Sequence, residues 1–198
     1  MKQDKTRSRM GHITLVTGGA KSGKSVFAEQ LAEQSGGRLG YIATARAGDE
    51  EMRRRIIRHQ ERRDTRWQTL EEPLRPSALI AAKETQTDFD VLLLDCLTVL
   101  ISNILLSEPL NWDAPDPKAL LSVETLVMVE MEALVGAAAN FTGHLIMVAN
   151  EVGFGIVPPS PLARFFRDCA GSAGQYLAAR ADYVYLVVAG LPLCLKKA

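Results

Sequence analysis

The chain has 198 residues, enough for one domain whose core needs neither disulfides nor a structural metal. Apolar residues make up 47% of it and charged residues 23%, which excludes a disordered chain, a collagen-like fibre and a disulfide scaffold. Because 23 basic residues balance 23 acidic ones, the chain lacks the basic surplus typical of proteins that bind the phosphates of nucleic acid. We therefore expect a globular protein that does not bind nucleic acid.

The N-terminal segment and the cysteines indicate the compartment. Residues 1–9 are basic, but the apolar run that follows, 13–16, is too short for a signal peptide. The longest uncharged stretch, 134–150, is broken by Gly, Asn, Thr and His and would span a bilayer poorly. Three scattered cysteines predict small core residues in a reducing compartment rather than disulfides or a zinc site: Cys96, Cys169 and Cys194. The sequence thus predicts a cytoplasmic protein without a membrane span.

Hydrophobic patterning in the first half of the chain predicts strands and helices in alternation. We expect a disordered polar tail over residues 1–10 and a single nucleotide-binding domain over 11–198. A β-rich run at 12–17 ends in two glycines, and a helix follows at 25–34 until Gly36 and Gly37 stop it. The next predicted elements are a strand at 39–45, a highly charged helix at 49–63 and one or two helical turns at 77–82.

The second half continues the alternation. Residues 91–95 form an apolar run that ends in a carboxylate, which is typical of a strand buried on both faces. Helices are expected at 97–106, 118–140 and 162–180, strands at 145–149, 183–188 and 193–196, and loops at 108–117 and 151–161. Strands that alternate with helices predict an α/β domain with a mainly parallel central sheet, whose ligands bind beyond the carboxyl ends of the strands.

The segment after the first predicted strand matches the phosphate-binding pattern G-x-x-x-x-G-K-[ST] at every fixed position. Glycines let backbone N–H groups turn inward around phosphate oxygens, and the following helix adds the positive end of its dipole. In this pattern Lys24 reaches the terminal phosphates and Ser25 offers a hydroxyl to Mg²⁺. The predicted nucleotide-binding residues are Gly18, Gly19, Ala20, Lys21, Ser22, Gly23, Lys24 and Ser25.

Asp95, at the tip of the predicted 91–95 strand, is a second candidate for the nucleotide site. In P-loop proteins an Asp at this place helps to hold Mg²⁺, so Ser25 and Asp95 form the predicted metal site. The alternative is an ordinary strand-end carboxylate that caps the next helix. The phosphate loop favours the metal-side role.

The charged segment 49–63 contains one histidine, His59. On a helix it would share a face with Arg55, Arg62 and Arg63. Composition alone favours a solvated, salt-bridged helix with an incidental histidine. A functional interpretation also has a physical basis, because neighbouring guanidinium groups disfavour the imidazolium and can clamp a triphosphate that a neutral histidine attacks. The other histidines, His12 and His144, each precede a strand and so belong to the wrong edge of a parallel sheet.

A series of further motifs follows in order along the chain: Thr17 to Ser25, Tyr41-Ile42-Ala43-Thr44-Ala45, Glu51-Met52, Arg55-Ile56, His59, Arg63, Trp67, Glu71, Leu94-Asp95-Cys96-Leu97-Thr98, Asn103, Asn150-Glu151-Val152-Gly153, Gly155-Ile156-Val157-Pro158, Ala163-Arg164, Arg167-Asp168 and Gly190-Leu191-Pro192. Together they resemble the bifunctional adenosylcobinamide kinase / adenosylcobinamide-phosphate guanylyltransferase family of cobalamin biosynthesis. The resemblance runs from about residue 12 to 196 and is weakest at 73–90 and 108–117.

The resemblance implies two reactions. In the first, ATP or GTP phosphorylates the hydroxyl on the aminopropanol arm of adenosylcobinamide. In the second, GTP guanylylates the enzyme on a histidine, which falls on His59 here, and GMP passes to the cobinamide phosphate to give adenosyl-GDP-cobinamide. It also implies a P-loop (RecA-like) three-layer fold and a homotrimer. The implied catalytic residues are His59 and Lys24, and it is this resemblance that reverses the preference for an incidental histidine.

The same matching extends the nucleotide site to residues outside the phosphate loop: Ala43, Thr44, Ala45, Gln60, Glu61, Arg62, Arg63, Glu71 and Asp95. Each has a plainer alternative, such as a strand end for Ala43 to Ala45 or a surface acid for Glu71. Residues 150–153 follow a buried strand at the ligand-binding edge, and their alternative is a turn satisfied by local bonds. Arg164 and Asp168 are spaced for a simple helical ion pair.

Two other functions remain open from the sequence. One is a P-loop kinase for another small alcohol, in which His59 is structural. The other is a regulatory module that binds a nucleotide without turnover. The leading expectation is the bifunctional enzyme, with Mg²⁺ as cofactor, ATP and GTP as substrates, and adenosylcobinamide and its phosphate as acceptors.

Overall fold

A single sheet organises the computed structural model, which describes residues 11–45 and 64–198. The described strands pair in the order β3-β2-β4-β5-β1-β6-β7, and every pair is parallel except β6 with β7. Their bounds are β1 (His12–Gly18), β2 (Leu39–Ala43), β3 (Trp67–Glu71), β4 (Val91–Asp95), β5 (His144–Asn150), β6 (Tyr183–Val188) and β7 (Leu191–Lys197).

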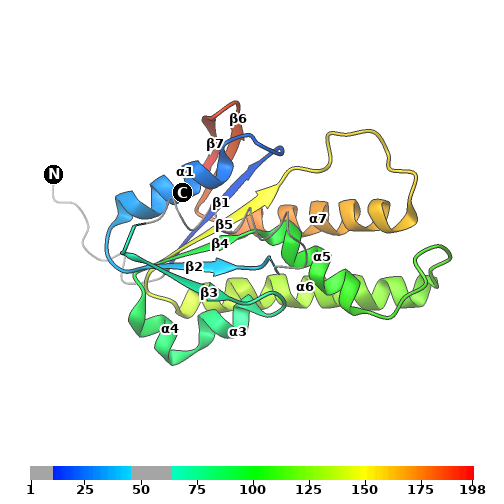
Figure 1. The fold of residues 1–198 in the computed structure, drawn as a ribbon, viewed down its shortest axis with the longest axis horizontal. Coiled ribbons are helices and arrows are strands. Elements are labelled where there is room, and N and C mark those ends of the chain that lie inside the picture. Colours follow the sequence, from blue (N-terminus) through cyan, green and yellow to red (C-terminus); the bar gives the residue numbers. More distant parts are fainter. Residues whose placement is uncertain (1–10, 46–63) are drawn as a thin grey trace.

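Helices cover both faces of this sheet (Figure 1). Helix α1 lies on one face against β1, β4, β5 and β6, and the other face carries α5, α6 and α7. The described helices are α1 (Lys24–Ser35), α3 (Pro76–Ala81), α4 (Lys83–Asp88), α5 (Leu97–Ser107), α6 (Pro117–Asn140) and α7 (Pro161–Arg180). This arrangement confirms the expected three-layer α/β P-loop fold with a mainly parallel central sheet.

Side chains on the central strands alternate between two cores. On β4, Leu92 and Leu94 pack into the core that includes α5, α6 and α7, whereas Val91 and Leu93 pack into the core on the side of α1. Successive residues of a strand face opposite sides of a sheet, so a strand covered on both faces must be apolar throughout. Polar side chains are therefore excluded from β4 until its last residue, Asp95, which lies at the sheet edge.

The structure corrects the sequence predictions at the edges of the sheet. No strand was expected around Trp67–Glu71, yet β3 forms there beside β2. Its residues are exposed or half-buried, so the segment lacks the apolar run that marks the central strands. At the C-terminus β7 turns back antiparallel to β6 through Ala189 and Gly190, whose φ values of 51° and 80° suit a tight hairpin turn.

Further predictions concern the cysteines, the shorter elements and membrane-spanning helices. Cys96 and Cys169 are buried as expected, but Cys194 is exposed on β7, so its assignment to the core was wrong. The short helix α4 was not predicted. The predicted tail at 1–10 and helix at 49–63 lie outside the described residues. Within the described residues, no helix is both long enough and apolar enough to cross a bilayer.

At the amino edge of the sheet, His144 is held neutral. Its Nε2 is 2.8 Å from the Thr14 hydroxyl and its Nδ1 is 3.4 Å from that of Ser35. Burial lowers the pKa of His144 to about 4, His12 nearby adds to the shift, and Asp182 opposes it. His12 and His144 pair at the first position of β1 and β5, so both lie at the edge away from the phosphate loop.

We predict that His144 makes the free energy of unfolding decrease as the pH falls. The unfolded chain takes up a proton at His144 below its ordinary pKa of 6.5, but the folded chain does so only below about 4. Stability is therefore complete above pH 6.5 and falls between pH 6.5 and 4, by about 3 kcal/mol at most. Urea unfolding of wild type and His144→Gln across this range checks the expectation. Parallel pH profiles for the two proteins would contradict it.

Candidate nucleotide-binding site

The predicted phosphate loop connects β1 directly to α1. Two residues in the loop have left-handed backbone conformations, Lys21 with φ 56° and Gly23 with φ 94°. The second is the N-cap of α1. Left-handed residues next to a helix start turn successive N–H groups toward one concave side, which is the geometry of an anion cradle. The loop thus has the backbone shape that phosphate binding requires.

Lys24 folds back over this loop. Its ammonium donates to the carbonyl oxygen of Gly19 at 3.2 Å, and the residue is only 8% exposed. Burial lowers the pKa of Lys24. Electrostatic interaction with Cys96, were its thiol ionised, and with Asp95 acts to raise the pKa. Because burial itself raises the pKa of the Cys96 thiol and keeps it neutral, Asp95 is the group that supports the Lys24 charge. A cation is therefore fixed inside the loop with a carboxylate nearby.

The interior of the loop is prepared for a ligand. The Ser22 hydroxyl is buried and has no hydrogen-bond partner among the described residues. A Cβ on Gly18 would come within 2.6 Å of that hydroxyl and 2.5 Å of the Val187 carbonyl, so only glycine fits there. A buried donor without a partner and a backbone approach that no side chain could share both suit a loop that closes around phosphate oxygens.

The hairpin of β6 and β7 supports the loop from behind. Gly190 at the hairpin turn donates its N–H to the Ser22 carbonyl at 2.8 Å. A Cβ on Gly23 would come within 3.1 Å of the Gly190 Cα. The hairpin turn therefore restrains the loop although the two segments are far apart in sequence.

Asp95 ends β4 at the same edge of the sheet. It is half-buried, and α5 begins two residues later without any side-chain cap at its N-terminus. The alternative in which Asp95 caps this helix is thus not what the structure shows. Ser25 and Asp95 offer a hydroxyl and a carboxylate oxygen, the kind of hard donors that Mg²⁺ takes together with substrate phosphates.

Neighbouring strands bring two further predicted residues to this edge. Ala43 on β2 pairs with Asp95 on one side and with Glu71 on the other. Glu71 is exposed, whereas Thr44 is fully buried and its hydroxyl bonds to the backbone of Cys96. Ala45 is half-buried. The remaining predicted site residues, His59, Gln60, Glu61, Arg62 and Arg63, lie outside the described residues.

Sequence reasoning did not assign Thr98 or Asn103 to the site, although both lie at this edge. The Thr98 hydroxyl accepts from the Asn150 side chain at 3.0 Å, and Asn103 donates to the Thr44 carbonyl at 2.8 Å. The available signal was their polarity within an otherwise apolar helix. Their partners, however, come from strands 52 and 59 residues away and could not be identified from spacing.

Two plainer alternatives from the sequence have different outcomes. Glu151 accepts from the Gly153 N–H at 2.7 Å, which is the expected local bond, but Asn150 is the last residue of β5 and its side chain bonds to the distant Thr98. The expected pair of Arg164 with Asp168 is wrong. Arg164 donates instead to the carbonyls of Pro158 and Pro159, and Asp168 lies 3.7 Å from Arg167.

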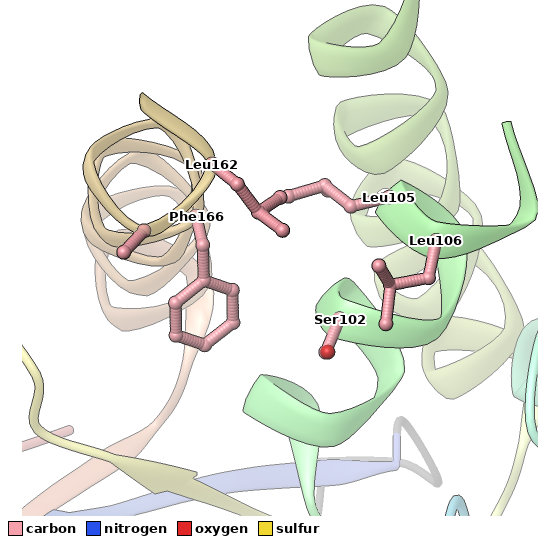
Figure 2. Close-up of a pocket in the computed structure, with 6 residues that line it drawn as sticks. Ser102, Leu105, Leu106, Leu162 and Phe166 are labelled. Atoms are coloured by element: carbon pink, nitrogen blue, oxygen red, sulfur yellow. The ribbon is translucent and has the colours of Figure 1, made fainter. Parts of the chain in front are cut away.

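An apolar hollow of about 170 Å³ lies between α5 and α7 (Figure 2). It is lined by Ser102, Leu105, Leu106, Leu162, Ala163 and Phe166. In Figure 2 the Ser102 hydroxyl is the one oxygen among the labelled side chains. This hollow therefore suits an apolar part of a ligand and does not resemble the phosphate loop.

Comparison with known proteins gives close relatives over nearly the whole chain. A bifunctional adenosylcobalamin biosynthesis protein CobP of Pseudomonas aeruginosa is 44% identical over 92% of this chain and 96% of its own. Proteins named CobU from Escherichia coli and Salmonella typhimurium are 41% and 40% identical, each over 93% of this chain and 99% of its own. A KaiC-like protein of Pyrococcus horikoshii, a solved structure, aligns with TM-score 0.48 at 13% identity over 89% of this chain and 71% of that one.

The family model described as cobinamide kinase / cobinamide phosphate guanyltransferase matches residues 14–195. This range begins in β1, includes the phosphate loop and Asp95, and ends in β7. The chain therefore belongs to the cobinamide kinase / cobinamide phosphate guanyltransferase family.

Proposed function

We propose that this protein phosphorylates adenosylcobinamide with ATP or GTP and then transfers GMP from GTP, through His59, to give adenosyl-GDP-cobinamide. The observation that carries the proposal is the buried Lys24 ammonium inside a phosphate loop, beside Asp95, in a chain of this family. We also assign the reaction to the cytoplasm, where both nucleotides are available. The alternatives of another small-alcohol kinase and of a regulatory module differ from this proposal in a measurable way.

In the kinase step, the loop and Lys24 hold the terminal phosphates of the donor nucleotide. The acceptor hydroxyl attacks the γ-phosphorus and releases its proton to solvent, and the nucleoside diphosphate leaves. Ser25 and Asp95 would hold Mg²⁺, which would supply positive charge to the phosphates. Ala43, Thr44, Ala45 and Glu71 are the proposed nucleotide contacts on the neighbouring strand ends. Lys24 supplies a fixed positive charge that needs no reorganisation during the reaction.

In the guanylyl step, His59 attacks the α-phosphorus of GTP and pyrophosphate leaves. The resulting phosphoramidate is then attacked by a phosphate oxygen of cobinamide phosphate, which releases His59 and completes the product. A covalent intermediate divides one difficult displacement into two easier ones. The proposed nucleotide contacts beside the nucleophile are Gln60, Glu61, Arg62 and Arg63.

We further propose a homotrimer, for which the β6–β7 hairpin supplies a contact surface. Val188, Leu191, Leu193 and Leu195 are each more than half exposed, and β7 is the edge strand of the sheet. An apolar edge strand left in water invites pairing with another chain. We expect light scattering to give three times the chain mass, and Leu193→Asp to lower that mass. A wild-type monomer with both activities would contradict the trimer.

Lys24 provides the test of the kinase site. We expect Lys24→Met to reduce phosphorylation of adenosylcobinamide by roughly 10²–10³-fold, because one preorganised charge at the transferring phosphates is lost. The variant should still fold, since methionine fills the space of the lysine side chain and removes the cost of a buried cation, which offsets the loss of the bond to the Gly19 carbonyl. Steady-state kinetics and urea unfolding measure the two effects. Unchanged phosphorylation would remove Lys24 from the site.

His59 provides the test that separates the three candidate functions. Wild type incubated with radiolabelled GTP should carry a covalent label that is labile in acid and stable in base, as expected for a phosphoramidate. His59→Ala should lose the label and guanylyl transfer but keep the kinase step. Turnover without a label would favour another small-alcohol kinase, and binding without either would favour a regulatory module. A labelled His59→Ala protein, or GMP located on His12 or His144 by mass spectrometry, would refute the mechanism.

A further inference from the structure

A chain of hydrogen bonds crosses the carboxyl edge of the sheet at right angles to the strands. It starts after β3, where Asn103 donates to the Pro73 carbonyl at 2.9 Å and to the Thr44 carbonyl at 2.8 Å. The Thr44 hydroxyl then donates to the Cys96 carbonyl and accepts from the Cys96 N–H, both at 2.9 Å. These bonds join the ends of β3, β2 and β4 in the order in which the strands lie.

The second half of this series of hydrogen bonds continues toward the phosphate loop. The Thr98 hydroxyl lies 3.1 Å from the Cys96 Sγ, and it accepts from the Asn150 Nδ2 at 3.0 Å and from the Asn150 N–H at 3.4 Å. The next residue, Glu151, donates its N–H to the Gly18 carbonyl at 2.9 Å. The bonds therefore reach from the residue after Asp95 to the first glycine of the loop.

Thr98 connects the ends of two neighbouring strands in this series of hydrogen bonds. The ladder between β4 and β5 ends where Asp95 pairs with Val148, and the ladder between β5 and β1 ends where Asn150 pairs with Gly18. Beyond those pairs the Thr98 hydroxyl joins the exit of β4 to the exit of β5 with bonds of 3.0 and 3.4 Å to Asn150, beside a longer contact of 3.9 Å between the Asn150 Nδ2 and the Cys96 Sγ. Thr98 is 5% exposed, so water competes little for its bonds and the spacing that they set is rigid.

We propose that Thr98 is a positioning residue for the kinase step, which holds the phosphate loop and Asp95 at the separation that phosphoryl transfer needs. The inference rests on the proposed function. Thr98 touches neither nucleotide nor acceptor in this assignment and acts through Asn150 and the strand ends. A reacting group displaced by about 1 Å loses on the order of 10²-fold in rate, so a small relaxation at this junction is measurable.

The test compares two substitutions at one position. Thr98→Val keeps the shape of the side chain but removes the Oγ acceptor for both Asn150 donors and leaves the side-chain amide only its longer contact with the Cys96 Sγ, at 3.9 Å, whereas Thr98→Ser keeps the hydroxyl. We expect Thr98→Val to lower the kinase kcat about tenfold or more while KM for ATP stays within about threefold, since the loop itself is intact. Thr98→Ser should recover most of the rate.

A matched control comes from α6. The Thr125 hydroxyl is exposed and donates only within its own helix, to the Leu121 carbonyl. Thr125→Val therefore makes the same chemical change away from the site and should leave kcat unchanged. Thermal unfolding of all three variants is measured alongside. A kcat loss in Thr98→Val that Thr98→Ser fails to recover would show a general structural role and overturn the proposal.

A second readout does not depend on the corrinoid reaction. Calorimetric ATP binding, with and without Mg²⁺, reports whether the loop and Asp95 act together. We expect Mg²⁺ to strengthen ATP binding in wild type and Thr98→Ser, and to do so less in Thr98→Val. Equal strengthening in all three proteins, together with equal kcat, would overturn the positioning role. A wild type that shows this strengthening but does not phosphorylate adenosylcobinamide would instead refute the proposed function.

Discussion

Burial of the central strands on both faces is the constraint on which the rest of the structure depends. With helices on each side, β4 and β5 have no solvated face on which a polar side chain could be placed. Hydrogen-bonding and charged groups are consequently displaced to the strand ends, and because the strands are parallel, their carboxyl ends meet at one edge. The phosphate loop, Asp95 and the bonds around Thr98 are thus products of one packing rule.

Lys24 shows how this edge is balanced electrostatically. A buried ammonium is unfavourable unless nearby negative charge or hydrogen bonds offset its lost hydration. Here a backbone carbonyl and the Asp95 carboxylate provide part of that compensation. A bound triphosphate would add several negative charges to the same place. The loop is therefore shaped and charged for an anion before the anion arrives, which reduces the reorganisation that binding requires.

The sequence predicted what depends on local pattern and missed what depends on distant partners. The loop motif, the apolar run of β4 and the final carboxylate of that run identified the main elements and the edge. Edge strand β3 escaped because its exposed side chains do not need an apolar pattern. Thr98 and Asn103 belong to the motifs that carry the resemblance, but their partners could not be predicted, because a hydrogen bond between residues more than 50 positions apart leaves no periodic signal. The exposure of Cys194 was not predicted, because the residue type alone does not distinguish a cysteine on an exposed edge strand from one in the core.

The two proposed transfers act on different phosphorus atoms of the nucleotide. The groups proposed for each transfer accordingly come from different parts of the sequence. The acceptor hydroxyl must reach a γ-phosphorus, which lies nearest the loop and Lys24, while His59 must reach an α-phosphorus further along the same nucleotide. One rigid cradle can serve both reactions only if the two nucleophiles approach from different places. The kinase groups lie on β1, α1 and β4, at the centre of the sheet. His59 follows β2 and precedes β3 in the sequence and lies outside the described residues. In the proposed mechanism the kinase nucleophile is a hydroxyl of the acceptor and the guanylyl nucleophile is His59, so the two steps share no nucleophile and one phosphate loop could hold the nucleotide for each.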